Sequence, residues 1–336
     1  MKKVKLGYYC ADVNPQKTGS IGIYKTTLEI LRELEKQDKF EVVIILTKKN
    51  KKYFKEFKSK KVVVKSNAPY LLRKIFFYPG AANKIAKKEK LDFLFFPKGH
   101  MSLVKVKKTK YVSFVHDLIP LYYLKKGRLD LAITTALLLF SLKFSDIVLV
   151  NSNYTKKVVK KFTKNKILVV PEGCNQVPVG KIKPKKNEYI FIAGSGAPHK
   201  NMGRTLDLIK KYNKKYGTNY EPYYPDGSLS EEELAGYYKN AKFTMFLSSI
   251  EGFGLPLIES YFYETPVVFN NATSLAELGK SLPGKCNVED DQSVFNAINE
   301  VLDLKKKDIQ ASRSMLLKKY NWKKCVEDIT KEIVKF

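Results

Sequence analysis

The stretch FLSSIEGFGLPLIESYFYETPVVFNN, residues 246–271, decides how the second half of the chain is expected to fold. An apolar run ends in two serines, the glycine-rich turn GFGLP follows, and a second apolar run closes the stretch. This order predicts a strand over 243–247, a loop, and a helix from Pro256, because proline is favoured in the first turn of a helix. Two carboxylates, Glu251 and Glu259, stand around the loop with seven residues between them.

This arrangement is suited to holding a polar ligand. A helix that starts directly after a strand points the backbone N–H groups of Gly254 and Leu255 at whatever lies beyond the strand. Glu251 precedes the loop and Glu259 lies one turn inside the helix, so the two carboxylates can reach different hydroxyls of one elongated polyhydroxy ligand. The spacing alone also allows a chance pair of glutamates beside a structural turn.

Strand-like and helix-like runs alternate along the chain, which predicts an α/β fold with doubly wound parallel sheets. The strand-like runs are nearly continuous in apolar residues, as in sheets that are covered on both faces. Predicted strands are 4–10, 41–47, 62–64, 92–97, 111–116, 147–151, 167–171, 189–193, 220–224, 243–247 and 266–269. Predicted helices are 24–35, 82–89, 130–144, one from about Met202, one from Glu231, 256–263 and 321–336.

The pattern breaks at NQVPVGKIKPKK, residues 175–186, where two prolines, a glycine and a charge run come together. We therefore expect a first Rossmann-like domain over 1–177, a linker over 178–188 and a second Rossmann-like domain over 189–320. Residues 321–336 are expected to form a helix that crosses back to the first domain. Two such domains would face each other across a cleft, and ligands would bind beyond the carboxyl ends of the strands.

Composition limits the class of protein. The chain has 336 residues, 44% of them hydrophobic, which is typical of a packed globular protein. Its four cysteines are scattered and indicate ordinary thiols in a reducing compartment. The amino-terminal residues do not resemble a secretory leader, and the most apolar run, 131–142, is short for a membrane span. The expected location is the cytoplasm, with the inner face of the membrane as an alternative.

Positive charge is concentrated in the first half. The whole chain has a net charge of +29, and residues 1–180 hold 38 Lys and Arg against 13 Asp and Glu. A basic surface of this kind favours an anionic partner such as a membrane surface, a phosphorylated acceptor or a nucleic acid. The aromatic and basic run 70–78 is a candidate for a membrane interface, although an ordinary core segment explains it as well. A lysine-rich surface that is merely solvated is the other interpretation of the charge.

Several motifs in order resemble the retaining glycosyltransferases of family 4, which have the GT-B fold. The Glu251–Glu259 pair matches the E-x7-E signature of that family. The segments TGSIGIY (18–24), VHDL (115–118), SDIVLVNS (145–152) and VPEG (170–173) match in the first half. In the second half AGSGAPHKN (193–201) resembles the donor phosphate loop, and LSEEEL (229–234) and NW (321–322) also match.

The resemblance implies a role for each matching residue. Glu251 would contact the transferred sugar, Glu259 would hold the nucleotide ribose, and Lys200 would neutralise the diphosphate. His116 would bind a sugar hydroxyl, with His100 and Asp117 as candidates to contact the acceptor. The other donor-binding candidates are Gly19, Gly22, Ser195, Leu229, Gly252, Phe253, Gly254 and Leu255.

The sequence departs from the family pattern in two places. Ser195 stands where many members have an arginine, which leaves Lys200 as the cation for the diphosphate. The segment 201–227 is short, so the base preference of the donor is open; Tyr223 and Tyr224, with Leu229, are candidates to pack on the base or to serve the core. The chain has no Asp-x-Asp motif and the three histidines are widely spaced, so no metal and no cofactor are expected.

The sequence therefore predicts a metal-independent hexosyltransferase. It would move a sugar from a UDP- or GDP-linked donor to an acceptor hydroxyl of a glycan, a lipid-linked glycan or a phosphorylated acceptor, in cell-surface polysaccharide or glycolipid assembly. A basic nucleic-acid-binding protein on the same scaffold is an alternative, which the intact Glu251–Glu259 loop disfavours. A hydrolase or epimerase of sugar nucleotides is another, and turnover without an acceptor would favour it.

Overall fold

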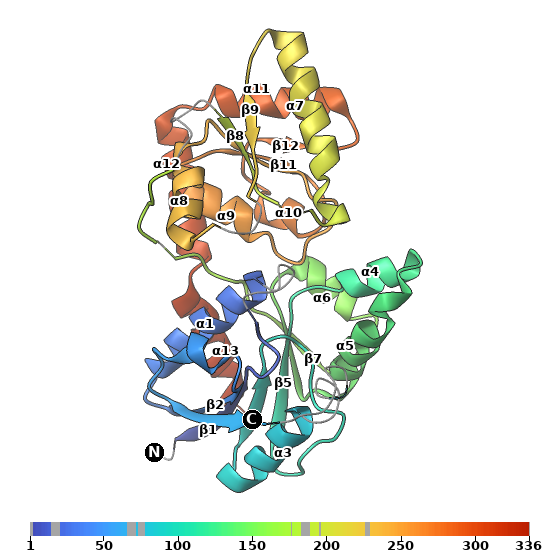
Figure 1. The fold of residues 1–336 in the computed structure, drawn as a ribbon, viewed down its shortest axis with the longest axis vertical. Coiled ribbons are helices and arrows are strands. Elements are labelled where there is room, and N and C mark those ends of the chain that lie inside the picture. The colour runs from blue at the N-terminus through green and yellow to red at the C-terminus, as the bar shows by residue number, and fades with distance from the viewer. Residues whose placement is uncertain are drawn as a thin grey trace. The chain divides into compact units, whose positions relative to one another are not determined.

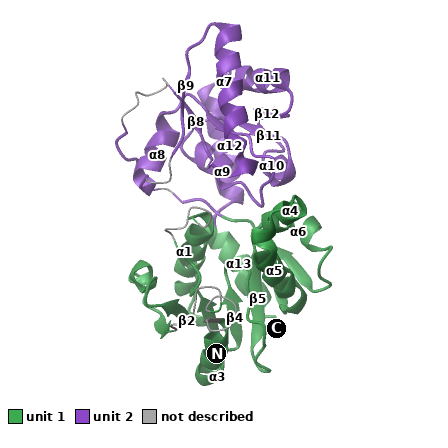
Figure 2. Ribbon diagram, turned by 45° about the vertical axis from the view of Figure 1, so that its right-hand side comes forward, with its two compact units in different colours: residues 1–172, 322–336 green, residues 173–321 purple. Residues whose placement is uncertain are grey.

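The computed structural model describes residues 3–14, 21–65, 72, 78–175, 177–182, 189–194, 196–225 and 229–335. The chain divides into two compact units, here called unit 1 (residues 1–172 and 322–336) and unit 2 (residues 173–321) (Figures 1 and 2). The first unit ends at Glu172, before the predicted linker, and residues 183–188 of that linker lie outside the described residues.

Unit 1 is built on a parallel sheet whose described strands run in the order β3-β2-β1-β4-β5-β6-β7. The order reverses beside β1, which pairs Leu6 with Val42 on one side and with Phe93 on the other. The predicted doubly wound sheet is thus confirmed. Its strands are β1 (Val4–Tyr9), β2 (Phe40–Thr47), β3 (Lys60–Val64), β4 (Phe93–Phe96), β5 (Lys110–Val115), β6 (Ile147–Val150) and β7 (Lys166–Val169).

Helices connect these strands, and the carboxyl-terminal helix joins them. The helices of unit 1 whose bounds lie within the described residues are α1 (Ile21–Glu35), η2 (Lys51–Phe54), α3 (Tyr78–Glu89), α4 (Ile119–Lys125), η4 (Leu129–Leu131), α5 (Ala132–Phe144), α6 (Asn153–Val159) and α13 (Trp322–Ile333). The buried side chains of Trp322, Val326 and Ile329 enter the same core cluster as Leu28 and Leu31 of α1. Figure 2 shows α13 beside α1 within unit 1. The last helix therefore returns to the first unit, as predicted.

Unit 2 has a smaller parallel sheet, whose described strands run in the order β12-β11-β10-β8-β9. The strands are β8 (Tyr189–Ile192), β9 (Glu221–Tyr223), β10 (Thr244–Phe246), β11 (Val267–Asn270) and β12 (Lys285–Cys286). The helices are η5 (Pro198–Lys200), α7 (Met202–Tyr216), α8 (Glu231–Asn240), α9 (Leu255–Phe262), α10 (Thr273–Leu278), α11 (Asp291–Leu302) and α12 (Lys306–Lys319). The short segment after Asn201 thus holds α7 and the brief edge strand β9.

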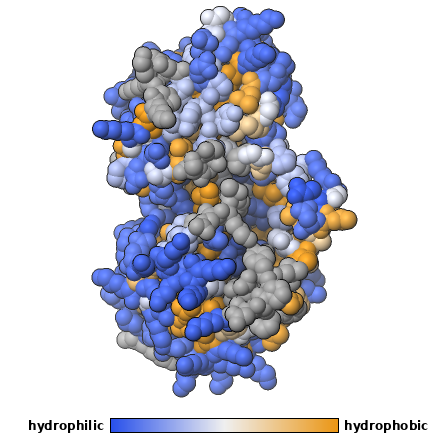
Figure 3. Space-filling view, in the orientation of Figure 1, coloured by the Kyte–Doolittle hydropathy of each residue, from blue (hydrophilic) through white to orange (hydrophobic). Residues whose placement is uncertain are grey.

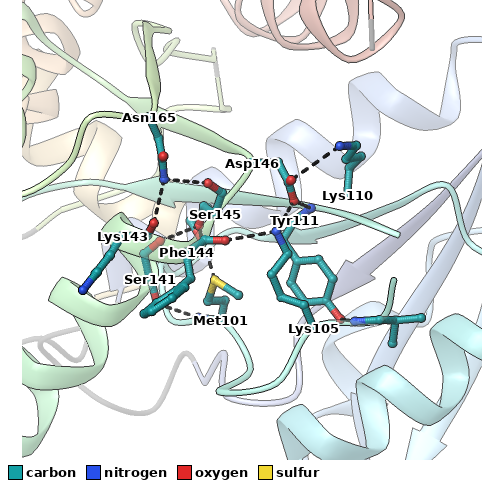
Figure 4. A network of polar contacts seen from close by, with 12 residues as sticks. Met101, Lys105, Lys110, Tyr111, Ser141, Lys143, Phe144, Ser145, Asp146 and Asn165 are labelled. Atoms are coloured by element: carbon teal, nitrogen blue, oxygen red, sulfur yellow. Dashed lines mark hydrogen bonds and ion pairs between the residues drawn. The ribbon is translucent and has the colours of Figure 1, made fainter. Parts of the chain in front are cut away.

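A polar network fixes the end of α5 and the starts of β5 and β6 (Figure 4). Asn165 Nδ2 donates to the carbonyl oxygens of Leu142, Lys143 and Ser145, which α5 leaves without intrahelical partners. The Asp146 carboxylate accepts from the Tyr111 backbone N–H at 2.8 Å. These bonds anchor the carboxyl-terminal end of α5 to the sheet.

Candidate functional site

The loop between β10 and α9 has the geometry that the GFGLP turn predicts. Gly254 is the N-cap residue of α9, with φ of 117°, and Pro256 lies in the first turn. A Cβ added at Gly254 would lie 2.4 Å from Cδ2 of Leu275, so both the backbone angle and the available space require glycine. Pro256 has no N–H and Leu257 donates its N–H to the Gly254 carbonyl oxygen at 3.1 Å, so the N–H groups of Gly254 and Leu255 are the ones that the start of α9 can offer to a ligand.

Glu251 is held by its backbone from α10. Its N–H donates to Thr273 Oγ1 at 3.2 Å, and the Ser274 hydroxyl donates to its carbonyl oxygen at 3.0 Å. Thr273 adopts a left-handed φ of 53°, which is strained for a β-branched residue. The two hydrogen bonds place the carboxylate of Glu251, whose residue is only 9% exposed. No motif in the sequence indicated this role for Thr273 or Ser274.

Lys200 lies against the same carboxylate. Its Nζ is 2.5 Å from Oε1 of Glu251 and 5.2 Å from the centre of the Phe246 ring. Asn201, in the left-handed conformation, turns the chain from η5 into α7, and its Nδ2 donates to the Leu247 carbonyl at 2.8 Å. The segment that resembles a phosphate loop is thereby tied to the end of β10.

His199 forms a second hydrogen bond between this segment and the residues after β10, and its imidazole is neutral. Its carbonyl oxygen accepts from the Ser249 N–H at 2.8 Å. Burial lowers the pKa of His199, the positive charge of Lys200 lowers it further, and Glu251 only partly opposes them. His199 is therefore uncharged at neutral pH, which leaves Lys200 as the cation of this segment.

Glu259 lies on α9, one turn from its start, and is 8% exposed. Its Oε2 accepts a hydrogen bond of 3.1 Å from the hydroxyl of Tyr238 in α8. Burial raises the pKa of Tyr238 well above its ordinary value, and the charge of Glu259 raises it further. Tyr238 is thus a permanent donor that orients Glu259, and the motif did not reveal it.

The remaining candidates in unit 2 lie around this loop. Gly252 is buried beside Glu251. The ring of Phe253 is buried in the core against Tyr320, with ring centroids 5.6 Å apart, so only its backbone is available to a ligand. Leu229 and Leu255 are half-buried against the same core cluster. Ser195 lies outside the described residues.

Tyr223 and Tyr224, the aromatic candidates to pack on the nucleotide base, differ in burial. The Tyr223 ring stacks on Tyr237 with centroids 3.9 Å apart and an interplanar angle of 9°, and it packs against the unit 2 core. Tyr224 is 48% exposed. Tyr223 therefore serves the core, whereas Tyr224 presents its ring to solvent.

A cavity of about 440 Å³ with a mixed polar and apolar lining lies beyond the carboxyl ends of β10, β11 and β12. Hydroxyl and amide side chains of Ser249, Asn270, Asn271, Asn287 and Ser293 line it. Ser249 joins this cavity to the His199–Lys200 segment through the hydrogen bond described above. No motif in the sequence indicated it.

In unit 1, His116 is part of a buried cluster at the carboxyl edge of the sheet. Its Nδ1 is 2.8 Å from Oε1 of Glu172, and its Nε2 is 2.7 Å from the carbonyl oxygen of Pro97. Asn151 Nδ2 donates to the same Glu172 oxygen at 3.1 Å. Both neighbours of the imidazole are acceptors, so a protonated ring donates to both.

The protonation of His116 follows from this cluster. Burial by itself lowers the pKa of His116, but the hydrogen bond to Glu172 and the charge of that carboxylate outweigh burial and raise it above 6.5. Both ring nitrogens are engaged, so a sugar hydroxyl would have to replace one of these bonds. The VPEG motif, in which Glu172 lies, did not indicate this contact with His116.

The other candidates of unit 1 share this edge or lie near it. His100 follows Gly99, whose φ is 80°, after the end of β4 and is half-buried. The Asp117 carboxylate accepts from the Ile119 N–H at 2.9 Å at the start of α4. A Cβ added at Gly22 would meet nothing within 4 Å, which leaves room beside α1. Gly19 lies outside the described residues.

The part of the chain that the structure describes contains neither a candidate metal site nor a disulfide. No group of three or more His, Cys, Asp and Glu side chains there is placed to hold a metal ion. The four cysteines are buried thiols that form no disulfide. None of the described helices is long and apolar enough to cross a bilayer.

Two parallel α/β units and a carboxyl-terminal helix that returns to the first unit define the class of GT-B glycosyltransferases. Residues 22–176 match the sequence model of Glycosyltransferase Family 4, and residues 226–314 match that of Glycosyl transferases group 1. The chain belongs to this family of glycosyltransferases.

Curated relatives share parts of the chain. A protein named glycosyltransferase 48, of the Sulfolobus islandicus filamentous virus, is 30% identical over 148 residues, which are 40% of this chain and 48% of the relative. A glycosyltransferase of Methanocaldococcus jannaschii is 24% identical over 212 residues, which are 56% of this chain and 59% of the relative. The chain thus spans about half the length of the curated relatives it matches.

Solved structures resemble the whole chain in fold. Sucrose-phosphate synthase from Thermosynechococcus elongatus has a TM-score of 0.71 at 13% identity and covers 99% of both chains. HepE from Anabaena, solved with UDP-glucose, has a TM-score of 0.70 at 12% identity, covering 99% of this chain and 100% of HepE. At these identities the likeness establishes the fold and not the substrate.

Proposed function

We propose that this protein is a retaining glycosyltransferase that moves a hexose from a nucleotide-diphosphate donor to an acceptor hydroxyl. The observation that carries the proposal is the geometry of one loop in unit 2. Two buried carboxylates, Glu251 and Glu259, stand around the start of α9, and Lys200 lies 2.5 Å from the first of them. Family membership of both halves supports the same activity.

In this proposal unit 2 holds the donor. The diphosphate lies by Lys200 and the N–H groups of Gly254 and Leu255 at the start of α9, which offer positive charge and hydrogen bonds to an anion. Glu259, oriented by Tyr238, accepts a hydrogen bond from the ribose. Glu251 contacts the sugar and balances the positive charge that develops at its anomeric carbon. Because HepE was solved with UDP and with UDP-glucose, UDP is the first nucleotide to test as the donor's leaving group.

The transfer itself needs no dedicated side-chain base. The bond between the anomeric carbon and the donor phosphate oxygen breaks, and the acceptor oxygen attacks from the same face. A phosphate oxygen of the departing diphosphate takes the proton of the acceptor hydroxyl. The configuration at the anomeric carbon is retained, and proton NMR of the product would test this through the coupling of the anomeric proton.

Unit 1 is proposed to hold the acceptor, with His116, His100 and Asp117 at or near the carboxyl edge of its sheet. The net charge of residues 1–180 favours a lipid-linked or phosphorylated acceptor and peripheral attachment to an anionic membrane. Such an acceptor fits a role in cell-surface polysaccharide or glycolipid assembly.

Isothermal titration calorimetry with UDP, GDP, ADP and UDP-glucose tests the donor site. The wild type should bind one of these in the micromolar range, and Glu259→Gln should weaken that binding. The control is Glu264→Gln, which removes a carboxylate of the same unit that pairs with Lys239 at 3.2 Å on the surface. Failure of every nucleotide to bind would overturn the proposal, and release of free sugar without an acceptor would replace it by a hydrolase.

A further inference from the structure

The α5 helix of unit 1 exposes an apolar face. Leu129 of the preceding turn is 76% exposed, Ile133 is 45% exposed and Phe144 is 42% exposed. Ala132 and Ala136 are exposed as well. Ala132, Ala136 and Phe144 follow at intervals of four and eight residues, which places them along one side of α5 with Ile133 next to Ala132. Together with Leu129, which stands in η4 before the helix, they are here called the α5 stripe (Leu129, Ala132, Ile133, Ala136 and Phe144).

The α5 stripe is not the face that packs on the sheet. The buried side chains of α5 are Thr135, Leu137, Leu138, Ser141 and Leu142. A surface helix of a soluble protein ordinarily turns polar residues outward, whereas α5 is apolar on both sides. In Figure 3, hydrophobic residues reach the surface at the side of unit 1 where Figure 1 places α4 and α5. An exposed apolar surface of this kind marks an interaction site.

Basic side chains stand at both ends of the stripe. Lys125, Lys126 and Arg128 precede Leu129 and are exposed. At the other end, Lys143 lies beside Phe144, with its Nζ 5.5 Å from the centre of the ring. Apolar side chains flanked by lysine and arginine are the combination that binds the interface of an anionic bilayer.

The charge of the chain also distinguishes between the two partners that could cover the stripe, a second copy of this chain and an anionic membrane. Residues 1–180 hold 38 basic and 13 acidic side chains, so a second copy of this chain would bring positive charge against positive charge. Anionic lipid headgroups offer the opposite charge, and the adjoining acyl chains accept the apolar side chains. Charge complementarity therefore favours a membrane over a second copy.

The stripe is also fixed in place. Asn165 and Asp146 anchor the end of α5, and Lys105 Nζ donates to the Phe144 carbonyl oxygen at 3.1 Å (Figure 4). At the other end, Arg128 pairs with the Asp130 carboxylate through two bonds of 2.9 and 2.8 Å. Docking thus requires no folding of the helix.

We propose that the α5 stripe docks in the headgroup region of an anionic bilayer, with Leu129, Ile133 and Phe144 inserted and the flanking lysines on the lipid phosphates. The assignment adds an apolar contact to the attachment by charge proposed above. It does not depend on the transferase activity, so nucleotide binding and membrane binding can fail separately.

Sedimentation with vesicles tests the apolar part of the proposal. Vesicles of phosphatidylcholine with 30% phosphatidylglycerol should bind the full-length protein, and Leu129→Ser/Ile133→Ser should weaken the partition by about tenfold or more. Val334→Ser, which changes another exposed apolar residue of unit 1, should change it less than about twofold. In 0.5 M NaCl the wild type should bind more weakly but still exceed the double variant.

A second pair of variants tests the charge. Lys125→Glu/Lys126→Glu should reduce binding at low salt much more than Lys48→Glu/Lys49→Glu, which makes the same change of charge elsewhere on unit 1. Equal losses from the two pairs, or full binding by Leu129→Ser/Ile133→Ser, would overturn the docking surface, as would absence of wild-type binding. Sedimentation equilibrium that finds a dimer broken by Leu129→Ser/Ile133→Ser would assign the stripe to a second copy instead.

Discussion

Lys200 and Glu251 form an ion pair of 2.5 Å between two segments to which the family resemblance assigns different parts of one ligand, the diphosphate and the transferred sugar. The lysine side chain is 18% exposed and the glutamate side chain is 11% exposed, so each neutralises the other in partly buried surroundings. A diphosphate that binds beside Lys200 would compete with Glu251 for its ammonium group. In the proposed function, the pair would therefore link the placement of the Glu251 carboxylate to the binding of the diphosphate beside Lys200.

Lys200→Met should abolish most of the transferase activity. The variant loses the cation for the leaving diphosphate, and removal of one such preorganised group lowers kcat by about 10²–10³-fold. It also leaves Glu251 buried without its cation, which should cost about 3 kcal/mol of stability. Initial rates with the donor found by calorimetry, together with urea unfolding, measure both effects.

A double-mutant cycle with Glu251→Gln separates the two effects. If the ion pair is the source of the lost stability, Lys200→Met in the Glu251→Gln background should cost far less than it does in the wild type. Additive losses of stability would contradict the pairing as a stabilising contact. Full activity of Lys200→Met would contradict its role at the diphosphate.

Tyr238→Phe should weaken nucleotide binding without touching the nucleotide. The hydroxyl of Tyr238 orients Glu259 through a bond of 3.1 Å, and hydrogen bonds to charged groups contribute about 1.5–3 kcal/mol. We expect a several-fold rise in Kd, smaller than that of Glu259→Gln. In the Glu259→Gln background, Tyr238→Phe should have little further effect on Kd, and an equal effect there would show that Tyr238 acts by another route.

The fold was accessible from the sequence because the strands are short apolar runs separated by clear turn signals. All the predicted strands are present, whereas β12 and the helices α4, α6, α10, α11 and α12 were not predicted. The two-residue strand β12 is too short to leave a periodic signal, and α12 is nearly polar all round, with Leu316 as its buried residue. Tertiary contacts specify β12 and α12, whereas α11 has a local signal that the prediction missed, an N-cap at Asp290 and a buried apolar face that includes Ile298 and Val301.

Residues of the candidate site could be predicted from the sequence only where they belong to a recognisable motif. The partners that position Glu251, Glu259 and His116 come from other segments, and a serine, threonine or tyrosine at such a distance has no sequence signal. Glu172 is the exception. It follows β7 directly, and the carboxyl ends of parallel strands share one edge, so its approach to His116 after β5 could have been inferred.

The titration of the histidines should reveal the two environments. The pKa of His116 lies above 6.5 and that of His199 lies below it. Proton–nitrogen NMR of the three histidines should therefore show one ring that holds its proton to higher pH and one that loses it earlier. Glu172→Gln should lower the pKa of His116 and leave that of His199 unchanged. Equal shifts of both would indicate a general disturbance of the fold.

The raised pKa of His116 makes the stability of unit 1 depend on pH. The folded state binds the His116 proton more tightly than the unfolded state, so this contribution is complete below about pH 6.5 and is lost as the pH rises through the folded-state pKa. The single tryptophan, Trp322, is buried in unit 1 and reports its unfolding by fluorescence. The wild type should lose stability from pH 6 to pH 9 relative to His116→Gln. A parallel dependence in both proteins would contradict the His116–Glu172 pair.

Gly254→Ala should damage both the stability of unit 2 and the donor site. The residue has φ of 117°, and its new Cβ would lie 2.4 Å from Leu275 Cδ2, so either the loop or α10 must shift. Substitution at such an angle costs more than about 1 kcal/mol, and displacement of α10 would move Thr273 and Ser274, which hold Glu251.

Gly203→Ala is the matched control, because its Cβ meets nothing within 4 Å and alanine favours the helix α7. Thermal unfolding should therefore show a lower Tm for Gly254→Ala and an equal or higher Tm for Gly203→Ala. A normal Tm and normal nucleotide affinity for Gly254→Ala would mean that the loop does not need this conformation, and the positioning of Glu251 from α10 would fall with it.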